Sequence, residues 1–422
     1  MKKLYIESLG CPKNLTDSEL ILYTFKKKGY KIVSDFNQAD IIIVNTCGFI
    51  KKAKEESLEY ILHYAGLGKK KIIVTGCLVN LYKEELQKQI PEVKFFYSID
   101  EFFKTHVGSD YDHRLDYSGF QELTPLSYTY IKVSDGCSKN CSYCTIPLIK
   151  GKQFSRPIDN IMIEIKKKAE YGFKEFDLIA QDLLQFGLRE KRESLFGLLD
   201  RIEQLPYDIR VRLLYLYPDK KLIELARKIR DSEKIINYLD IPVQHSSEKI
   251  LKAMNRPFDS RFYFDLFEQI KKIDEFTIRS TFIAGFPGEG EDDFQNLKEF
   301  IKVTEFNWAG FFSYSDEENT VSSRLPEKIE EKKIKERLGD LTNLQGRITS
   351  KWLNTRLEKT YDVVVDELVP SDGYILCRSD HEAPDIDGSI IIKFKDNIKA
   401  GDRIKVRIKK SLDYDLEGEI YE

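Results

Sequence analysis

Short apolar runs alternate with amphipathic stretches through the first hundred residues. Nearly continuous apolar runs are typical of strands buried on both faces of a parallel sheet, whereas apolar residues three or four positions apart are typical of helices. We expect strands at residues 3–8, 39–46 and 70–76, and helices at 17–29, 51–65 and 80–90. The pattern therefore predicts an N-terminal α/β domain with a parallel sheet over residues 1–104.

A second alternating region follows a polar, weakly periodic stretch at residues 105–126, which we expect to be a linker. Six strand–helix repeats favour a β/α barrel, complete or partial, over an open sheet, and the expected domain covers residues 127–325. The six expected strands lie at residues 128–135, 175–182, 208–217, 237–244, 276–285 and 307–315.

The hydrophobic period changes towards the carboxyl end. A long charged helical pattern at residues 326–353 is expected to form a connector. Beyond it, apolar and polar residues alternate in short segments that are separated by glycine and aspartate turns, which predicts a small closed antiparallel β-barrel at residues 354–422. Its expected strands lie at residues 361–369, 373–379, 388–394 and 402–410. The fold class is therefore α/β with a small β-barrel attached.

The composition narrows the functional class. The chain has 422 residues, a net charge of −3, and hydrophobic and charged fractions typical of globular proteins. No apolar run approaches the roughly 18 residues of a membrane span, and the first ten residues lack the apolar core of a signal peptide. We therefore expect a cytoplasmic protein without a membrane partner, in which the seven cysteines form no disulfide framework.

Three cysteines lie within eight residues, in the segment SDGCSKNCSYCTIP. They are Cys137, Cys141 and Cys144. Thiolates in such a loop select iron–sulfur clusters or zinc. A structural zinc site needs four protein ligands, whereas this loop offers three and has no histidine nearby. Three cysteines on a four-iron cluster would leave one iron open to another ligand, and free or zinc-binding cysteines are the alternative.

Cys11, Cys47 and Cys77 are far apart in the sequence, but each follows a predicted strand of the N-terminal sheet. Loops at the carboxyl ends of parallel strands lie along one edge of the sheet. We therefore expect these cysteines to converge on a second three-thiolate cluster. The alternative is that each is a small buried apolar residue, which is the interpretation we favour for Cys377, alone in a predicted strand.

The C-x3-C-x2-C loop resembles the signature of the radical S-adenosylmethionine superfamily, in which the aromatic residue before the last cysteine, here Tyr143, lies near the adenine. With its three domains, the chain resembles the methylthiotransferase family of that superfamily, whose C-terminal barrel is called TRAM. The phrase SLGCPKNLTDSE at residues 8–19 resembles the branch that modifies an aspartate of ribosomal protein S-twelve. Residues 213–218, 238–247 and 281–289 also resemble that branch, whereas the tRNA-modifying branch carries a phrase of the type YGCQMN.

The resemblance implies that a methylthio group is added to the β-carbon of that aspartate, in the free ribosomal protein or in the small subunit. It implies two 4Fe–4S clusters, with sulfide or polysulfide on the auxiliary cluster of Cys11, Cys47 and Cys77. S-adenosylmethionine would act as methyl donor and as radical source, and a flavodoxin or ferredoxin would supply electrons. Radical chemistry suits this substrate because an unactivated C–H bond offers no acidic proton to a general base.

Several isolated polar residues and one glycine are weaker candidates. Gly285 could let the backbone approach the cofactor closely, or it could only form a turn. Arg212 and Gln181 lie at or near predicted strand ends and are expected to face the cofactor, and Gln244 the substrate; structural roles are the alternative. A radical mechanism needs no histidine base, so His245 is expected to be structural.

The predicted small barrel is acidic, with 11 lysine and arginine residues against 16 aspartate and glutamate residues at positions 354–422. Phosphate backbones are bound by lysine and arginine, so this charge makes a tRNA partner a poor match. A basic ribosomal protein suits it better, and we expect Asp385 and Asp387 to contact substrate, unless the charges serve only solubility. Methylthiolation of a tRNA adenosine and a non-catalytic metal- and RNA-binding protein remain the alternative functions.

Overall fold

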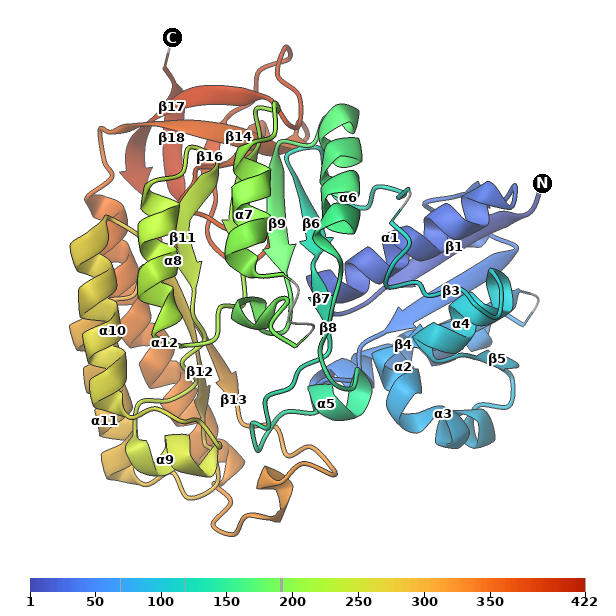
Figure 1. The fold of residues 1–422 in the computed structure, drawn as a ribbon, viewed down its shortest axis with the longest axis horizontal. Helices are drawn as coiled ribbons and strands as arrows, with labels where there is room; N and C mark the ends of the chain where they lie inside the picture. Colours follow the sequence, from blue (N-terminus) through green and yellow to red (C-terminus); the bar gives the residue numbers. More distant parts are fainter. Residues whose placement is uncertain (69, 118, 190–192, 422) are drawn as a thin grey trace.

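The computed structural model describes residues 1–421 apart from residues 69, 118 and 190–192. Figure 1 shows three units: an N-terminal domain in blue, a central domain from green to orange, and a small barrel in red. None of the helices in the described parts of the chain has the length and apolar character needed to span a membrane.

The N-terminal domain is built on a five-stranded parallel sheet with the order β2-β1-β3-β4-β5. Its strands are β1 (Lys3–Ser8), β2 (Lys31–Ile32), β3 (Ile41–Thr46), β4 (Lys71–Gly76) and β5 (Phe95–Phe96). Its helices are α1 (Pro12–Lys27), α2 (Lys51–Ala65), α3 (Cys77–Gln89) and α4 (Ile99–His106). Every residue of β3 is buried, as expected for a strand covered on both faces. The predicted parallel sheet is confirmed, although β2, β5 and α4 were not predicted.

The expected linker at residues 105–126 packs against its neighbours rather than hanging free. The Arg156 guanidinium lies 3.4 Å from the centre of the Tyr117 ring. The Asn160 side chain donates a hydrogen bond to the Leu115 carbonyl at 2.5 Å. This segment therefore joins the first two domains by packing as well as by covalent connection.

The central domain contains six parallel strands in the order β13-β12-β11-β10-β9-β6. They are β6 (Tyr128–Lys132), β9 (Glu175–Ile179), β10 (Arg210–Leu213), β11 (Ile235–Asp240), β12 (Thr277–Ala284) and β13 (Trp308–Ser313). Among the described residues β6 and β13 do not pair with each other, so the predicted barrel is partial. Helices cover its outer face (Figure 1), namely α6 (Ile158–Tyr171), α7 (Leu195–Glu203), α8 (Lys221–Arg230), α10 (Ser260–Ile273), α11 (Glu291–Thr304) and α12 (Glu331–Asn354).

Shorter elements form the loops of the central domain. A two-stranded antiparallel ribbon flanks the cysteine loop, with β7 (Ser134–Asp135) before it and β8 (Phe154–Ser155) after it. The short helix α5 (Ile146–Ile149) follows the third cysteine of the loop, and α9 (Glu248–Ala253) follows β11.

The C-terminal domain is a closed five-stranded barrel with the order β14-β15-β16-β18-β17. The strands are β14 (Thr360–Val369), β15 (Tyr374–Arg378), β16 (Ile390–Lys393), β17 (Arg403–Ser411) and β18 (Leu416–Ile420). The fifth strand was not predicted, and its pairing with β16 is parallel in an otherwise antiparallel barrel. Cys377 is fully buried in the apolar core of this barrel, as expected from its place in a strand.

The two smaller domains lie at opposite ends of the central strands. At the carboxyl end of β6, the Lys132 ammonium pairs with Asp17 of α1. Near its amino end, the Tyr128 hydroxyl donates a hydrogen bond to Asp385 of the small barrel at 3.0 Å. The edge where α/β proteins bind ligands, at the carboxyl ends of the strands, therefore faces the N-terminal domain.

Candidate metal and cofactor site

The three N-terminal cysteines meet at the carboxyl edge of their sheet. Cys11 precedes α1, Cys47 directly follows β3, and Cys77 is the first residue of α3. A Cβ atom on Gly10 would lie 2.7 Å from the Cβ of Cys47, and one on Gly48 would lie 3.0 Å from the carbonyl carbon of Cys77. Only glycine allows backbones to approach so closely, so the glycines beside Cys11 and Cys47 bring the three loops together.

Asn14 joins these loops through its side chain. Its Nδ2 donates hydrogen bonds to the carbonyls of Leu9 at 2.9 Å and Thr46 at 2.8 Å. Its Oδ1 accepts one from the Cys77 thiol at 3.6 Å, and its own carbonyl accepts one from Asn45 at 2.9 Å. Sequence reasoning missed Asn14, which lies inside the phrase around Cys11 and carries no chemical signal of its own.

The central cysteines occupy a tight loop between β7 and α5. All three are partly buried. The amide of Cys144 donates a hydrogen bond to the Cys141 carbonyl at 3.1 Å, and the amide of Lys139 donates one to the Cys137 sulfur at 3.4 Å. The amide of Cys137 is held by the Gly151 carbonyl at 3.2 Å. The backbone therefore fixes the three thiols within one turn-rich segment.

Burial raises the pKa of four of these thiols. It raises the pKa values of Cys77 and Cys144 to about 12, and it also raises those of Cys47 and Cys137. A thiol with a raised pKa is a poor nucleophile at neutral pH. A metal centre would supply the positive charge that stabilises the thiolates, so the donor set fits ligands better than nucleophiles.

Among the described residues, no three cysteine, histidine, aspartate or glutamate side chains are placed to hold one metal ion. The assignment of an iron–sulfur cluster to each set of three thiols stays a prediction, which rests on the number and the chemistry of the cysteines.

The loops that carry the two cysteine sets meet across the domain interface. The Thr145 hydroxyl, one residue after Cys144, donates a hydrogen bond to the carbonyl of Phe49 at 3.1 Å, two residues after Cys47. Asn80 of α3 donates one to the Ile149 carbonyl at the end of α5 at 3.0 Å. Figure 1 shows α5 beside this part of the N-terminal domain. The loops that carry the two sets are thus in direct contact.

Buried ion pairs hold this interface together. Asp17 of α1 pairs with Lys132 and, at 3.1 Å, with Lys150. Burial by itself would raise the pKa of Asp17, but the two ammonium groups lower it below its ordinary value. Glu19 of the same helix pairs with Lys168 at 3.1 Å. Breaking such a pair leaves an uncompensated buried charge, so these contacts fix the N-terminal domain on the central one.

The partly buried Tyr143 and the buried Arg256 form a pair beside the central cysteines. The Tyr143 hydroxyl accepts a hydrogen bond from the Arg256 guanidinium at 3.2 Å, and the Tyr143 ring packs against an apolar cluster that contains Met254 and Phe286. Two other nitrogens of this guanidinium, Nε and Nη1, have no hydrogen-bond partner among the described residues. Unpaired buried donors are costly, and here they fit a ligand with an anionic group. Arg256 was not predicted from the sequence.

Gln181 and Gln244 both lie at the carboxyl edge of the central sheet. The Gln181 amide donates a hydrogen bond to Asp135 at 3.0 Å, while its buried Oε1 has no hydrogen-bond partner within the described chain. Next to it, burial raises the pKa of Asp182 to about 6. Gln244 has a positive φ of 75° and bonds to β12 through its backbone. The roles of Gln181 and Gln244 stay predictions.

The structure corrects the expectation for Arg212. Its Nε donates a hydrogen bond to Glu175 at 2.7 Å, and its Nη1 donates one to the Asp380 carbonyl at 3.0 Å. These partners lie at the end of the sheet that the small barrel covers, away from the cysteine loops. Arg212 was assigned to the cofactor only because it was expected to lie at or near a strand end.

The structure gives Gly285 a packing role. Its φ is +78°, and a Cβ atom there would lie 2.3 Å from Cγ1 of Ile334 on α12. The absent side chain therefore makes room for the connector helix. The approach to a cofactor that was expected at Gly285 stays a prediction.

Asp385 and Asp387 both bond to the central domain, Asp385 from an exposed position and Asp387 with its side chain fully buried. Asp385 accepts hydrogen bonds from the hydroxyls of Tyr128 and Tyr130, and Asp387 accepts one from Tyr238 at 2.5 Å. Burial raises the pKa of Asp387 to about 6. Asp387 is therefore too buried to meet the expectation that it contacts substrate, whereas the role expected for Asp385 stays a prediction.

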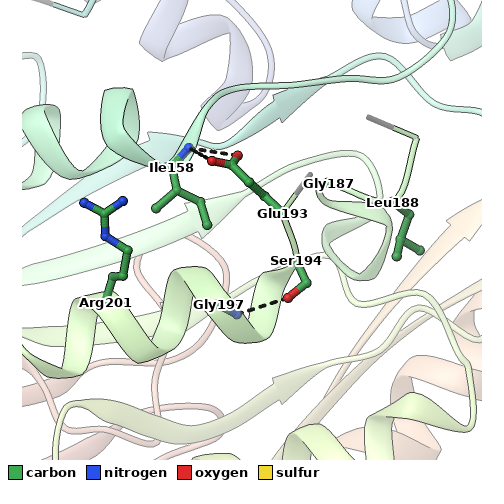
Figure 2. Close-up of a pocket in the computed structure, with 7 residues that line it drawn as sticks. All are labelled: Ile158, Gly187, Leu188, Glu193, Ser194, Gly197 and Arg201. Atoms are coloured by element: carbon green, nitrogen blue, oxygen red, sulfur yellow. Dashed lines mark hydrogen bonds between the residues drawn. The ribbon is translucent and has the colours of Figure 1, made fainter. Parts of the chain in front are cut away.

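Figure 2 shows a surface hollow elsewhere, between the first turns of α6 and α7. The Glu193 carboxylate accepts both of its hydrogen bonds from the Ile158 amide at 3.0 Å, and the Ser194 hydroxyl accepts one from the Gly197 amide at 3.1 Å. These side chains cap helices, and the hollow contains none of the candidate residues.

Comparison with family models divides the chain into the same three parts. Residues 3–98 match Uncharacterized protein family UPF0004, residues 131–301 match the Radical SAM superfamily, and residues 359–420 match the TRAM domain.

Relatives similar over the whole chain are named ribosomal protein uS12 methylthiotransferase RimO. The protein from Aquifex aeolicus (strain VF5) is 40% identical, over 99% of this chain and 96% of its own length. The protein from Clostridioides difficile (strain 630) is 37% identical, over 100% of this chain and 99% of its own.

Solved structures share the fold at low sequence identity. The radical S-adenosylmethionine methyltransferase TsrM from Kitasatospora setae has a TM-score of 0.54 and 10% identity, covering 74% of this chain and 73% of its own. The cobalamin-dependent radical enzyme OxsB has a TM-score of 0.51 and 11% identity, covering 82% of this chain and 56% of its own.

Proposed function

The chain belongs to the RimO family of ribosomal protein uS12 methylthiotransferases, and from this premise we propose that it adds a methylthio group to the β-carbon of an aspartate in uS12. It is a radical S-adenosylmethionine enzyme, and membership of that superfamily implies a 4Fe–4S cluster and S-adenosylmethionine. We further propose that it works in the cytoplasm, where thiols stay reduced, and takes electrons from a flavodoxin or ferredoxin.

The observation that carries this proposal is the meeting of two three-cysteine sets at one domain interface. We assign the S-adenosylmethionine-binding cluster to Cys137, Cys141 and Cys144, as their spacing suggests. The auxiliary cluster, with sulfide or polysulfide, is assigned to the second set, Cys11, Cys47 and Cys77. The reaction removes a hydrogen atom from a carbon and then attaches sulfur to the same carbon. Both clusters must therefore lie within reach of one substrate atom, and the contact between the two cysteine loops meets that requirement.

The protein's own residues bind and orient the cofactors and the substrate, and they shield them from water. When bound, the clusters and S-adenosylmethionine supply the radical and sulfur chemistry that side chains lack. Tyr143 and Arg256 would bind S-adenosylmethionine beside its cluster, the guanidinium accepting an anionic group as its partner. Gln181 would complete that site with its unpaired Oε1, and Gln244 is proposed to contact the substrate. The buried pairs of Asp17 keep the two domains closed and water out.

A substrate competition under strict anaerobiosis tests the proposal. The protein is reconstituted with iron and sulfide, then given S-adenosylmethionine, a strong reductant, uS12 and bulk tRNA together. Mass spectrometry should find a methylthio group on an aspartate of uS12, together with 5′-deoxyadenosine. A methylthio group on tRNA adenosine alone would overturn the substrate assignment. Modification of neither, without 5′-deoxyadenosine, would favour a non-catalytic binding protein.

A further inference from the structure

Lys13 is a buried cation without a carboxylate partner among the described residues. It is 8% exposed. Its Nζ donates a hydrogen bond to the Ala180 carbonyl at 3.3 Å and lies 3.3 Å from the centre of the Tyr215 ring.

Every other buried lysine of this interface has a carboxylate in contact. Lys132 pairs with Asp17. Lys150 pairs with Asp17 and Asp135, and Lys168 pairs with Glu19 and Glu164. An ammonium taken out of water without a counter-ion is costly. The exception at Lys13 therefore indicates that an anionic partner arrives from outside the chain.

The ammonium lies at the interface between the N-terminal and central domains. Lys13 is two residues after Cys11, and its acceptor Ala180 directly precedes Gln181 at the carboxyl edge of the central sheet. An anion bound to Lys13 would therefore sit within the same interface as both proposed clusters.

The Tyr215 ring beneath the ammonium is held by a strained backbone. Tyr215 has a positive φ of 63°, which is unusual for a bulky residue. Its amide donates a hydrogen bond to Asp240 at 2.9 Å, and its carbonyl accepts one from Leu183 at 3.0 Å. Such strain persists only where the surroundings enforce it, and it clusters at functional sites.

We propose that Lys13 binds the side-chain carboxylate of the substrate aspartate, an inference that rests on the proposed function. The β-carbon is bonded to that carboxylate, so anchoring the carboxylate at Lys13 holds the reacting C–H bond at the interface where the cysteine loops meet. Lys13 is thereby a substrate-binding residue that selects aspartate over asparagine. The same contact discriminates against nucleosides as substrates, because nucleosides carry no carboxylate.

A double-mutant cycle on the reconstituted holoenzyme tests this pairing. Binding of uS12 and of a uS12 variant with asparagine at the modified position is measured by titration, with the original protein and with Lys13→Met. The original protein should bind the aspartate form about ten- to a hundredfold more tightly, as for a hydrogen-bonded charge pair. Lys13→Met should lose that preference, and Lys13→Arg, which keeps the charge, should retain part of it.

Two controls make the outcome specific. Lys51→Met removes a lysine of the same interface whose side chain is 78% exposed, and it should leave the preference for aspartate in place. Iron content and the electron paramagnetic resonance spectrum should be the same in Lys13→Met as in the original protein. A full preference for aspartate in Lys13→Met would overturn the inference, and a changed cluster spectrum with an unchanged preference would assign Lys13 to the cluster instead.

Failure of this inference is distinguishable from failure of the proposed function. If the original protein does not modify uS12, the proposed function fails. If it modifies uS12 but the cycle shows no coupling between Lys13 and the aspartate, only the role of Lys13 fails.

Discussion

Asn14 illustrates how single residues build the site without taking part in its chemistry. A side-chain amide offers two donors and one carbonyl acceptor, and Asn14 uses its amide nitrogen on two carbonyls and its oxygen on the Cys77 thiol. Replacing it by alanine would leave two buried carbonyls and a thiol without this partner. The cysteine loops are thus held by backbone and amide contacts, and the Cys77 sulfur gives up its hydrogen bond to Asn14 when it loses its proton to bind metal.

Removing one cysteine from each set should remove one cluster. After anaerobic reconstitution we expect about eight iron atoms in the original protein and about four in Cys47→Ala or Cys141→Ala, since each cluster needs its thiolates. Cys377→Ala removes a buried cysteine of the small barrel and should keep all the iron. Iron and sulfide analysis with absorption spectroscopy measures this, and full iron content in Cys47→Ala would refute an auxiliary cluster at that set.

Individual helices and strands were predictable from the sequence where their burial produces a clear pattern of apolar residues. β3 is buried at every position and its apolar run predicted it, whereas β2 and β5 have two residues each and leave no period to detect. The carboxylate of Asp387 was assigned to substrate because a sequence cannot show that its partner is a tyrosine more than 140 positions earlier. Long-range pairing, rather than local propensity, decided these cases.

The junction between β12 and α12 depends on Gly285. Gly285→Ala should destabilise the protein more than Gly288→Ala does. Both residues have a positive φ, so both variants incur a backbone cost of about 1–2 kcal/mol. Only at Gly285 would the new Cβ meet another helix, 2.3 Å from Ile334, whereas at Gly288 the nearest atom is 3.4 Å away. The overlap should add about 1–3 kcal/mol.

Chemical denaturation of the two variants measures this difference. Adding Gly285→Ala to an Ile334→Ala background should cost less than adding it to the original protein, because truncating Ile334 relieves most of the overlap. Equal destabilisation of the two single variants would show that α12 is not seated on Gly285.

The central domain has two interfaces, one with the N-terminal domain and one with the small barrel, and they have different functions. The carboxyl ends of the central strands face the N-terminal domain and carry the proposed chemistry, while the amino ends are closed by the small barrel. The charge of the barrel suggested a surface for a basic partner, yet some of its acidic residues bind tyrosines and arginines of the central domain. The barrel is therefore structurally part of the central domain as well as a separate fold.

Glu175 is a buried link between the barrel and the central domain. Glu175→Gln should lower the stability of the protein and weaken the attachment of the barrel. Its carboxylate accepts a hydrogen bond from Arg212 at 2.7 Å and one from Arg378 of the barrel at 3.1 Å. Burial alone would raise the pKa of Glu175, but these two guanidinium groups lower it to about 2, so the group is charged at neutral pH. A neutral amide would leave two buried guanidinium groups without their shared anion, which should cost about 3–5 kcal/mol.

Asp208 provides a matched control, because it also links the two domains, through Arg403 at 3.1 Å, but lies on the surface with 86% of its side chain exposed. Exposed pairs contribute only about 0–1 kcal/mol, so Asp208→Asn should hardly change the free energy of unfolding. Denaturation curves give the stabilities, and limited proteolysis reports whether the barrel detaches, which we expect only for Glu175→Gln. Equal effects of the two variants would mean that apolar packing, and not the buried ion cluster, holds the barrel in place.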